Sequence, residues 1–190
     1  MIWSRAFGAA WAVLCVYWLW SARRLKATSR AEPFAKRFLA YWLPLIVAYN
    51  LVGPGDWFGD SLLHRRFLPL STPVLVAGLA LTWLGVLFAC WARSVLGSNW
   101  SSVVKLRQDH ELIEQGPYRS IRHPIYTGLI VAFAGTALGI GEWRALLALV
   151  IVTVSFGFKL RQEERWLGEQ FGFEYAAYRA RSWALLPGIL

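Results

Sequence analysis

Charged residues, cysteine and histidine are scarce in this chain, and each shortage excludes a class of protein. Only 16% of the 190 residues are charged and 57% are hydrophobic, whereas a soluble domain carries about a quarter charged residues. The two cysteines, Cys15 and Cys90, lie within apolar stretches and provide neither a disulfide framework nor a zinc ligand set, so we predict no metal site. The chain also lacks a glycine-rich dinucleotide fingerprint, which excludes a Rossmann domain.

Acidic residues are outnumbered by basic ones, 11 to 20, but the placement of the excess argues against a nucleic-acid partner. Most basic residues fall between the first and second apolar stretches, between the third and fourth, and after the fifth. Loops rich in Lys and Arg remain in the cytoplasm. We therefore predict an amino terminus outside and a carboxyl terminus inside the cytoplasmic (inner) membrane, with membrane lipids as neighbours.

Long apolar stretches predict the fold class. We expect an all-α integral membrane protein with about five transmembrane helices, a C-terminal amphipathic cytoplasmic helix and no Rossmann domain. The first stretch ends in aromatic residues and the pair Arg23-Arg24, without a small-residue cleavage site, which predicts a retained anchor rather than a signal peptide. The predicted spans are 6–22, 38–52, 74–92, 125–140 and 145–158.

The fourth and fifth stretches predict a tight helical hairpin. Gly139, Gly141 and Glu142 supply a short turn, and Gly135 with Gly139 forms a small-xxx-small pair that favours close helix approach. Both helices must then return to the same face of the membrane. This hairpin brings the polar block at 122–126 beside the polar block at 159–164, on the cytoplasmic side.

An amphipathic helix is predicted from 162 to about 181. Leu167, Phe171, Tyr175 and Tyr178 follow one another at steps of four, four and three, so they share one face. Such a helix lies along the membrane interface or covers the mouth of a cavity.

The first polar block, Arg122-His123-Pro124, has the features of an anion-binding helix start. Proline suits the first turn of a helix, where the free N–H groups and Arg122 can face an anion. His123 can donate to a carboxylate or a ribose hydroxyl. The alternative is a basic flank before a helix, which explains Arg and Pro but neither His123 nor Tyr126.

The second polar block, Glu163-Glu164, lies at the end of a helix, where the dipole disfavours acids. These acids need a partner. Either Lys159 and Arg161 neutralise them in a structural cluster, or a bound cation does. The segment 103–113 is expected to wall a site between the two blocks, with Lys105, His110, Leu112 and Ile113.

Together these motifs resemble the isoprenylcysteine carboxyl methyltransferase family and its prokaryotic relatives over about half the chain, residues 99–187. The matching elements are HELI at 110–113, GPYR at 116–119, RHPIYTG at 122–128, EE at 163–164, Leu167, FG at 171–172, Tyr175, Tyr178 and Pro187.

The resemblance implies an integral-membrane enzyme that uses S-adenosylmethionine in a cytoplasm-facing pocket under the carboxyl-terminal helix. The substrate-side arginine of the family falls on Lys159 here, and Arg161 stands two residues before the first acid. By position, the implied cofactor contacts are Lys105, His110, Leu112, Ile113, Tyr118, His123, Pro124, Tyr126 and Glu163. Arg122, from the helix-start pattern, joins this set.

The leading functional hypothesis is a methyltransferase of the EC 2.1.1 class that acts on a lipophilic or lipidated acceptor entering from the bilayer. Carboxyl O-methylation of an isoprenylcysteine-like or other lipid-linked carboxylate comes first, with Lys159 or Arg161 orienting the acceptor. The enzymatic alternative is N-methylation of a phospholipid or lipophilic amine, with Glu164 taking up the proton of the amine. The non-enzymatic alternative is a membrane scaffold held by a structural ion-pair cluster. Residues 1–92 are expected to form a three-span scaffold, and 93–190 the cofactor-binding catalytic half.

Overall fold

The computed structural model describes residues 2–23, 35, 38–97, 112–186 and 188, and within them the secondary structure is helical. The prediction of an all-α fold is confirmed. The long elements are α1 (Ile2–Ala22), α3 (Leu43–Val52), α4 (Thr72–Leu96), α5 (Pro124–Ile140), α6 (Trp143–Phe171) and α7 (Phe173–Ala180). Shorter turns are the π-helix η1 (Phe38–Trp42) and the 3₁₀ helices η2 (Gly55–Phe58), η3 (Leu62–His64) and η5 (Gly116–Arg119).

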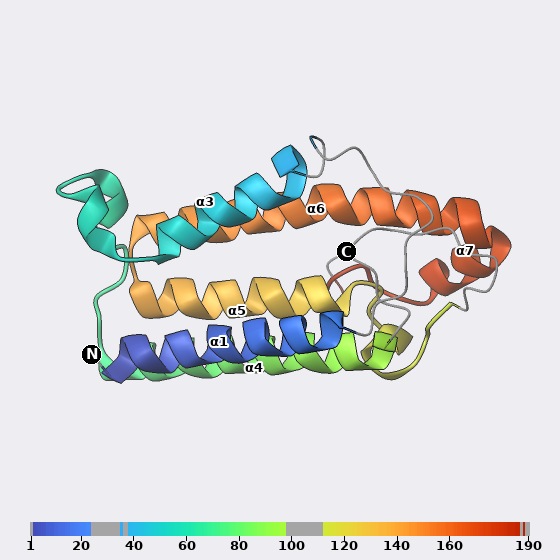
Figure 1. The fold of residues 1–190 in the computed structure, drawn as a ribbon, viewed down its shortest axis with the longest axis horizontal. Helices are drawn as coiled ribbons and strands as arrows, with labels where there is room; N and C mark the ends of the chain where they lie inside the picture. Colours follow the sequence, from blue (N-terminus) through green and yellow to red (C-terminus); the bar gives the residue numbers. More distant parts are fainter. Residues whose placement is uncertain (1, 24–34, 36–37, 98–111, 187, 189–190) are drawn as a thin grey trace.

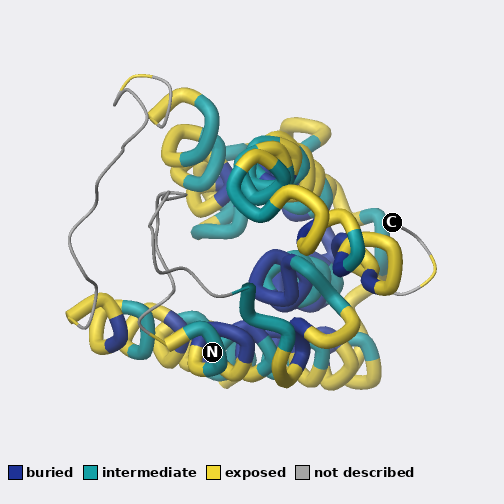
Figure 2. Tube along the Cα trace, turned by 90° about the vertical axis from the view of Figure 1, so that its right-hand side faces the viewer, coloured by how far each residue is buried: buried dark blue, intermediate teal, exposed yellow. Residues whose placement is uncertain are grey.

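Helix α5 lies between two groups of helices (Figure 1). On one side it packs against α4, which in turn contacts α1, and on the other side it meets α6, which carries α3. Buried residues gather on α5 and on the faces turned towards it, while exposed residues cover the outer sides of the bundle (Figure 2). Those outer sides are themselves apolar, with Val16, Leu84, Leu87 and Val154 all more than half exposed. Such a surface matches lipid rather than water.

The chain is a multi-pass membrane protein. Helices α1, α4 and α6 are long and apolar enough to cross a membrane, whereas η1 with α3 (Phe38–Val52) and α5 are shorter apolar helices. All five predicted apolar stretches therefore fall in helical segments, but only three reach the length of a span of about 20 residues. Helix α6, at 29 residues, is longer than a span requires, so its polar end projects beyond the apolar part.

The predicted hairpin is confirmed. Helix α5 ends at Ile140, the next residue, Gly141, has a left-handed backbone with φ of 69°, and α6 begins at Trp143. This conformation favours glycine because it has no Cβ. The turn is short, so the start of α5 and the end of α6 lie at the same end of the bundle (Figure 1).

The close approach predicted for the glycines of this hairpin is made to a different helix. A Cβ added at Gly135 would lie 2.6 Å from the carbonyl oxygen of Gly78, and one at Gly128 would lie 2.7 Å from that of Gly85, so both glycines face α4. Gly139 faces the ring of Phe7 on α1 as well as α4. The hairpin partner α6 contacts α5 less extensively, because bulky side chains such as Phe156 occupy that interface.

The prediction of one amphipathic helix over 162–181 is wrong in its continuity. Residues 162–171 continue α6, and Gly172, with φ of 51°, turns the chain into the separate helix α7. Within α7, Tyr175 and Tyr178 are buried, as their shared face predicted. The chain then returns to the start of α5, where Trp183 donates from its backbone to Ser120 and accepts from the backbone N–H of Arg122.

Candidate active site

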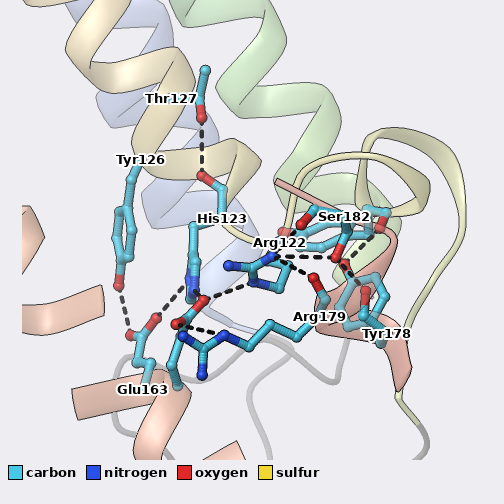
Figure 3. A network of polar contacts seen from close by, with 10 residues as sticks. Arg122, His123, Tyr126, Thr127, Glu163, Tyr178, Arg179 and Ser182 are labelled. Carbon is cyan, nitrogen blue, oxygen red and sulfur yellow. Dashed lines mark hydrogen bonds and ion pairs between the residues drawn. The ribbon is translucent and has the colours of Figure 1, made fainter. Parts of the chain in front are cut away.

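The two polar blocks meet at one end of the bundle, as the hairpin predicted (Figure 3). The hydroxyl of Tyr126 donates to Glu163 Oε1 at 2.6 Å, and His123 Nδ1 lies 3.4 Å from Glu163 Oε2. On its other side, His123 Nε2 lies 3.6 Å from Glu164 Oε1. The buried imidazole of His123 therefore lies between the carboxylates of two adjacent residues of α6, Glu163 and Glu164.

Arg122 ties the carboxyl-terminal segment to this group. Its Nε donates to Glu164 Oε1 at 2.7 Å, and its Nη1 donates to the carbonyl oxygens of Ser182 and, at 3.4 Å, Arg179. The backbone of His123 adds a hydrogen bond to Ala184 at 3.1 Å. Arg122 is thus engaged by protein groups on two sides, which makes it a clamp for the chain end as well as a wall of the site.

Opposing effects act on the protonation of His123. Burial lowers the pKa of the imidazole, but the polar contacts and negative charges of Glu163 and Glu164 outweigh burial and raise it above the usual histidine value. The protonated imidazole is therefore favoured by its surroundings, and it holds the two neighbouring carboxylates together.

Two buried tyrosines, Tyr118 and Tyr178, pack beside the polar residues of the site. The hydroxyl of Tyr178 on α7 donates to the carbonyl oxygen of Tyr118 at 2.5 Å, and both side chains are buried. Burial, followed by the charge of Glu163, raises the pKa of Tyr118 well above the ordinary tyrosine value. This tyrosine remains a neutral wall at physiological pH.

A cavity of about 1590 Å³ extends from these residues along the bundle. Its walls are mostly apolar side chains of α1, η1, α3, α5 and α6, and pockets for drug-sized ligands are typically 300–1,000 Å³. The volume is therefore larger than one small ligand needs. Most of the described residues expected to contact cofactor or acceptor line the cavity: Leu112, Ile113, Tyr118, Arg122, His123, Tyr126, Lys159 and Glu163.

Five of the predicted site residues are placed differently or not described. Pro124 is fully buried in the first turn of α5 and does not line the cavity, so its contribution is to begin the helix. Arg161 is exposed on α6 and away from the cavity wall. Glu164 is turned towards Arg122 rather than the cavity. Lys105 and His110 lie outside the described residues.

The amino-terminal half contributes walls that the sequence did not indicate. Trp11 and Trp18 on α1, Tyr41 in η1, and Leu45 and Tyr49 on α3 all line the cavity. Trp11 also donates to Thr136 on α5 at 3.1 Å. These residues belong to no motif, and only the density of aromatic side chains in 1–92 could have pointed to them.

A second polar cluster lies at the opposite end of the cavity. Arg144 Nε is 2.6 Å from Glu142 Oε2, and Arg144 Nη1 donates to the carbonyl oxygens of Leu51 and Gly53 at 2.6 and 2.7 Å. His64 and Arg66 approach Glu142 at 3.4 and 3.6 Å. The cluster satisfies carbonyl groups at the end of α3 and joins that helix to the hairpin turn.

Comparison with protein families gives a match over the region that contains both polar blocks. The model of the family described as phospholipid methyltransferase matches residues 73–174. That region begins at α4 and ends in α7, so it includes the hairpin and the acids of α6 but neither α1, η1 nor α3.

Curated relatives share about half to three quarters of the chain. The chain is 29% identical to protein-S-isoprenylcysteine O-methyltransferase B of Arabidopsis thaliana over 107 residues, which cover 55% of this chain and 54% of that protein. It is 28% identical to protein-S-isoprenylcysteine O-methyltransferase of Schizosaccharomyces pombe over 152 residues, 75% of this chain and 64% of that protein. The chain thus spans between about half and two thirds of the length of these relatives.

A solved structure shares the fold. The eukaryotic intramembrane Ras methyltransferase ICMT (isoprenylcysteine carboxyl methyltransferase) matches with a TM-score of 0.59 and 24% sequence identity, over 78% of this chain and 52% of that one. The arrangement of membrane helices is therefore one that has been observed experimentally.

Proposed function

Because the chain belongs to the phospholipid methyltransferase family, we propose that it transfers a methyl group from S-adenosylmethionine to a lipophilic acceptor at the polar end of the cavity. The observation that carries this proposal is the buried group of His123, Tyr126 and Glu163 at one end of an otherwise apolar cavity. Curated isoprenylcysteine O-methyltransferases among the relatives support the same chemistry.

The donor groups at this end suit the proposed cofactor. Glu163 offers carboxylate oxygens for an ammonium group or a ribose hydroxyl, and Tyr118 and Tyr126 offer aromatic walls for adenine or a cation. His123 Nε2 is buried and faces Glu164 at 3.6 Å, and Nδ1 faces Glu163 at 3.4 Å, so the imidazole holds Glu163 in position at the cavity wall.

S-adenosylmethionine supplies an activated methyl group when it is bound. A carboxylate acceptor is already nucleophilic, so the residues of this chain need not provide a general base. Their work is to align the acceptor and to exclude water, and the aromatic and aliphatic walls of the cavity serve both purposes.

The contacts of Glu164 favour a carboxylate acceptor over an amine. An amine acceptor must lose a proton, and Glu164 was the candidate to receive it. Its carboxylate is instead held by Arg122 at 2.7 Å and His123 at 3.6 Å, and it does not line the cavity. Lys159 does line the cavity, and its positive charge attracts a carboxylate and repels a protonated amine.

The scaffold hypothesis explains the Arg122–Glu164 pair but not the cavity. An ion-pair lock requires contact between the two helices and the chain end, which Arg122 provides. It does not require a cavity of about 1590 Å³ beside the lock. We therefore favour catalysis.

Further proposals concern the organisation of the chain. We propose that 93–190 hold the cofactor and that 1–92 form a membrane scaffold which also supplies one wall of the cavity. We also propose that the polar end faces the cytoplasm of a bacterial-type inner membrane, since most basic residues of the predicted loops lie at that end.

Calorimetry on the detergent-solubilised protein tests the proposal. We expect saturable binding of S-adenosylmethionine, and Glu163→Gln should weaken it at least tenfold because a charge-assisted hydrogen bond is lost. Glu169→Gln, at an exposed position on the same helix, is the matched control and should bind as the wild type does. Absence of binding by the wild type, together with a lower melting temperature for Glu163→Gln, would support the scaffold hypothesis instead.

The nature of the acceptor can be read from the product. Incubation with radiolabelled S-adenosylmethionine and a lipid extract should give a labelled species that releases its methyl group in mild base, as a methyl ester does. A base-stable product would show an amine acceptor.

A further inference from the structure

The ammonium group of Lys159 lies between two tyrosine rings. Its Nζ is 5.4 Å from the centroid of Tyr41 and 5.6 Å from that of Tyr126. Distances under about 6 Å are those of cation–π contacts. The rings come from η1 and α5, and the lysine comes from α6, so three separate elements meet at this charge.

Helix α6 is anchored to η1 on both sides of Lys159. Ser155 donates to the carbonyl oxygen of Ala40 at 2.8 Å, and the hydroxyl of Tyr41 donates to Gln162 Oε1 at 2.9 Å. Ser155, Lys159 and Gln162 are spaced by four and three residues and therefore form one stripe on α6. The lysine is at the centre of this stripe, so both anchors fix the Tyr41 ring relative to it.

The segment that carries Tyr41 is an unusual one. η1 is a π-helix, a rare element that is frequently found at functional sites. It also lies outside the region that the family model matches. The family match therefore does not by itself place a tyrosine beside Lys159.

We propose that Tyr41 is a positioning residue which, together with Tyr126, holds Lys159 in the cavity to receive the carboxylate of the acceptor. This inference rests on the proposed function. All three side chains line the cavity, and the polar group of Glu163 stands one turn further along α6. Lysine has a flexible stem and no planar fork, so it needs external contacts to fix its charge where an arginine would orient itself.

Kinetics can separate positioning from packing. Tyr41→Leu removes the ring, and we expect the KM for a lipophilic carboxylate to rise about 2- to 30-fold, the range of a cation–π contact, with little change in kcat or in the Kd of S-adenosylmethionine. Tyr41→Phe keeps the ring and loses only the hydrogen bond to Gln162, while the Ser155–Ala40 hydrogen bond still holds η1 on α6, so its KM should stay close to that of the wild type. Leu39→Ala, at an exposed position in the same π-helix, is the control and should behave as the wild type.

A double-mutant cycle provides the second readout. Tyr41 acts through Lys159, so adding Tyr41→Leu to Lys159→Met should raise the KM no further than Lys159→Met alone. Additive effects, or an unchanged KM in Tyr41→Leu, would overturn the proposal. A parallel fall in melting temperature and in cofactor affinity would show a packing role and would overturn it as well.

A binding measurement without cofactor keeps this proposal separate from the proposed function. The probe is an S-alkyl thioether carboxylate, compared with its own methyl ester by tryptophan fluorescence. The wild type and Tyr41→Phe should prefer the carboxylate, and Tyr41→Leu and Lys159→Met should lose that preference. Equal affinities in the wild type would refute the positioning role even if methyl transfer is observed, and a preference in the absence of methyl transfer would refute only the proposed activity.

Discussion

At the scale of single residues, His123 connects the two acids of α6. The sequence predicted that the RHP and EE motifs would meet, because a short hairpin allows no other outcome. The sequence could not predict which glutamate forms an ion pair with which basic residue. Arg122 pairs with Glu164 because the carboxyl-terminal segment of the chain returns beside it. That return depends on backbone pairing between Ile121 and Trp183, which no local sequence pattern encodes.

The raised pKa of His123 predicts a dependence of stability on pH. The pKa of His123 is higher in the folded than in the unfolded state, so its protonation stabilises the fold. This stabilisation is complete at pH values below the pKa of the unfolded state. It is lost as the pH rises through the pKa of the folded state. We therefore expect the melting temperature to fall as pH rises from about 6.5, the ordinary histidine pKa.

The replacement His123→Gln checks the assignment. Its melting temperature should be lower than that of the wild type at pH 6, and its decline above about pH 6.5 should be smaller, as followed by tryptophan fluorescence in detergent. An equally steep decline in the variant would show that another group is responsible.

At the scale of elements, α4 and α5 lie close enough for their backbones to touch, because glycines on each helix face backbone on the other. The sequence indicated the small-residue pattern of α5 but assigned it to the hairpin. A pattern on one helix shows that a neighbour comes close, and it does not show which neighbour. The complementary glycines at 78 and 85 on α4 settle the partner only once the helices are placed together.

Two glycine-to-alanine replacements distinguish this contact from ordinary helix positions. In Gly135→Ala the new methyl group would lie 2.6 Å from the carbonyl oxygen of Gly78, so the helices must separate, and we expect a loss of about 1–3 kcal/mol of stability. In Gly157→Ala on α6 the methyl group meets nothing within 4 Å, so stability should be unchanged or rise. Denaturation in detergent compares the two, and equal effects would contradict the close contact.

At the scale of the whole molecule, the cavity runs from Glu163 at one end to Glu142 at the other. These residues are 21 positions apart, about 30 Å along a helix at 1.5 Å per residue. Apolar stretches and charge placement predicted the helices and which of their ends carry polar residues, but a cavity depends on how side chains from all helices leave space. For this reason the sequence predicted the motif residues of the site but not Tyr41 or the residues of α1 that line the cavity.

The length of the cavity predicts a dependence on the chain length of the acceptor. Gly8 lines the cavity on α1, and a Cβ there meets nothing within 4 Å, so the side chain of Gly8→Phe has open space at its base and can narrow the cavity. We expect kcat/KM to fall for acceptors with long apolar chains and to change little for short ones. Ala9→Phe adds the same ring at an exposed neighbour outside the cavity wall and should leave both unchanged. A uniform loss for all chain lengths would show that the cavity does not hold the chain of the acceptor.

The glycine contact between α4 and α5 also affects the conformational entropy that side chains lose when the helices associate. Helices in lipid gain no hydrophobic energy by meeting, and a contact made by backbone immobilises no rotamers when it forms. The pair α4–α5 therefore associates with a smaller loss of side-chain freedom than α1, which packs through Trp11 and Trp18, and α3, which packs through Leu45 and Leu51. Since α5 begins directly after His123, this contact fixes the backbone of His123 relative to α4, and the contacts with Glu163 and Glu164 then orient its imidazole.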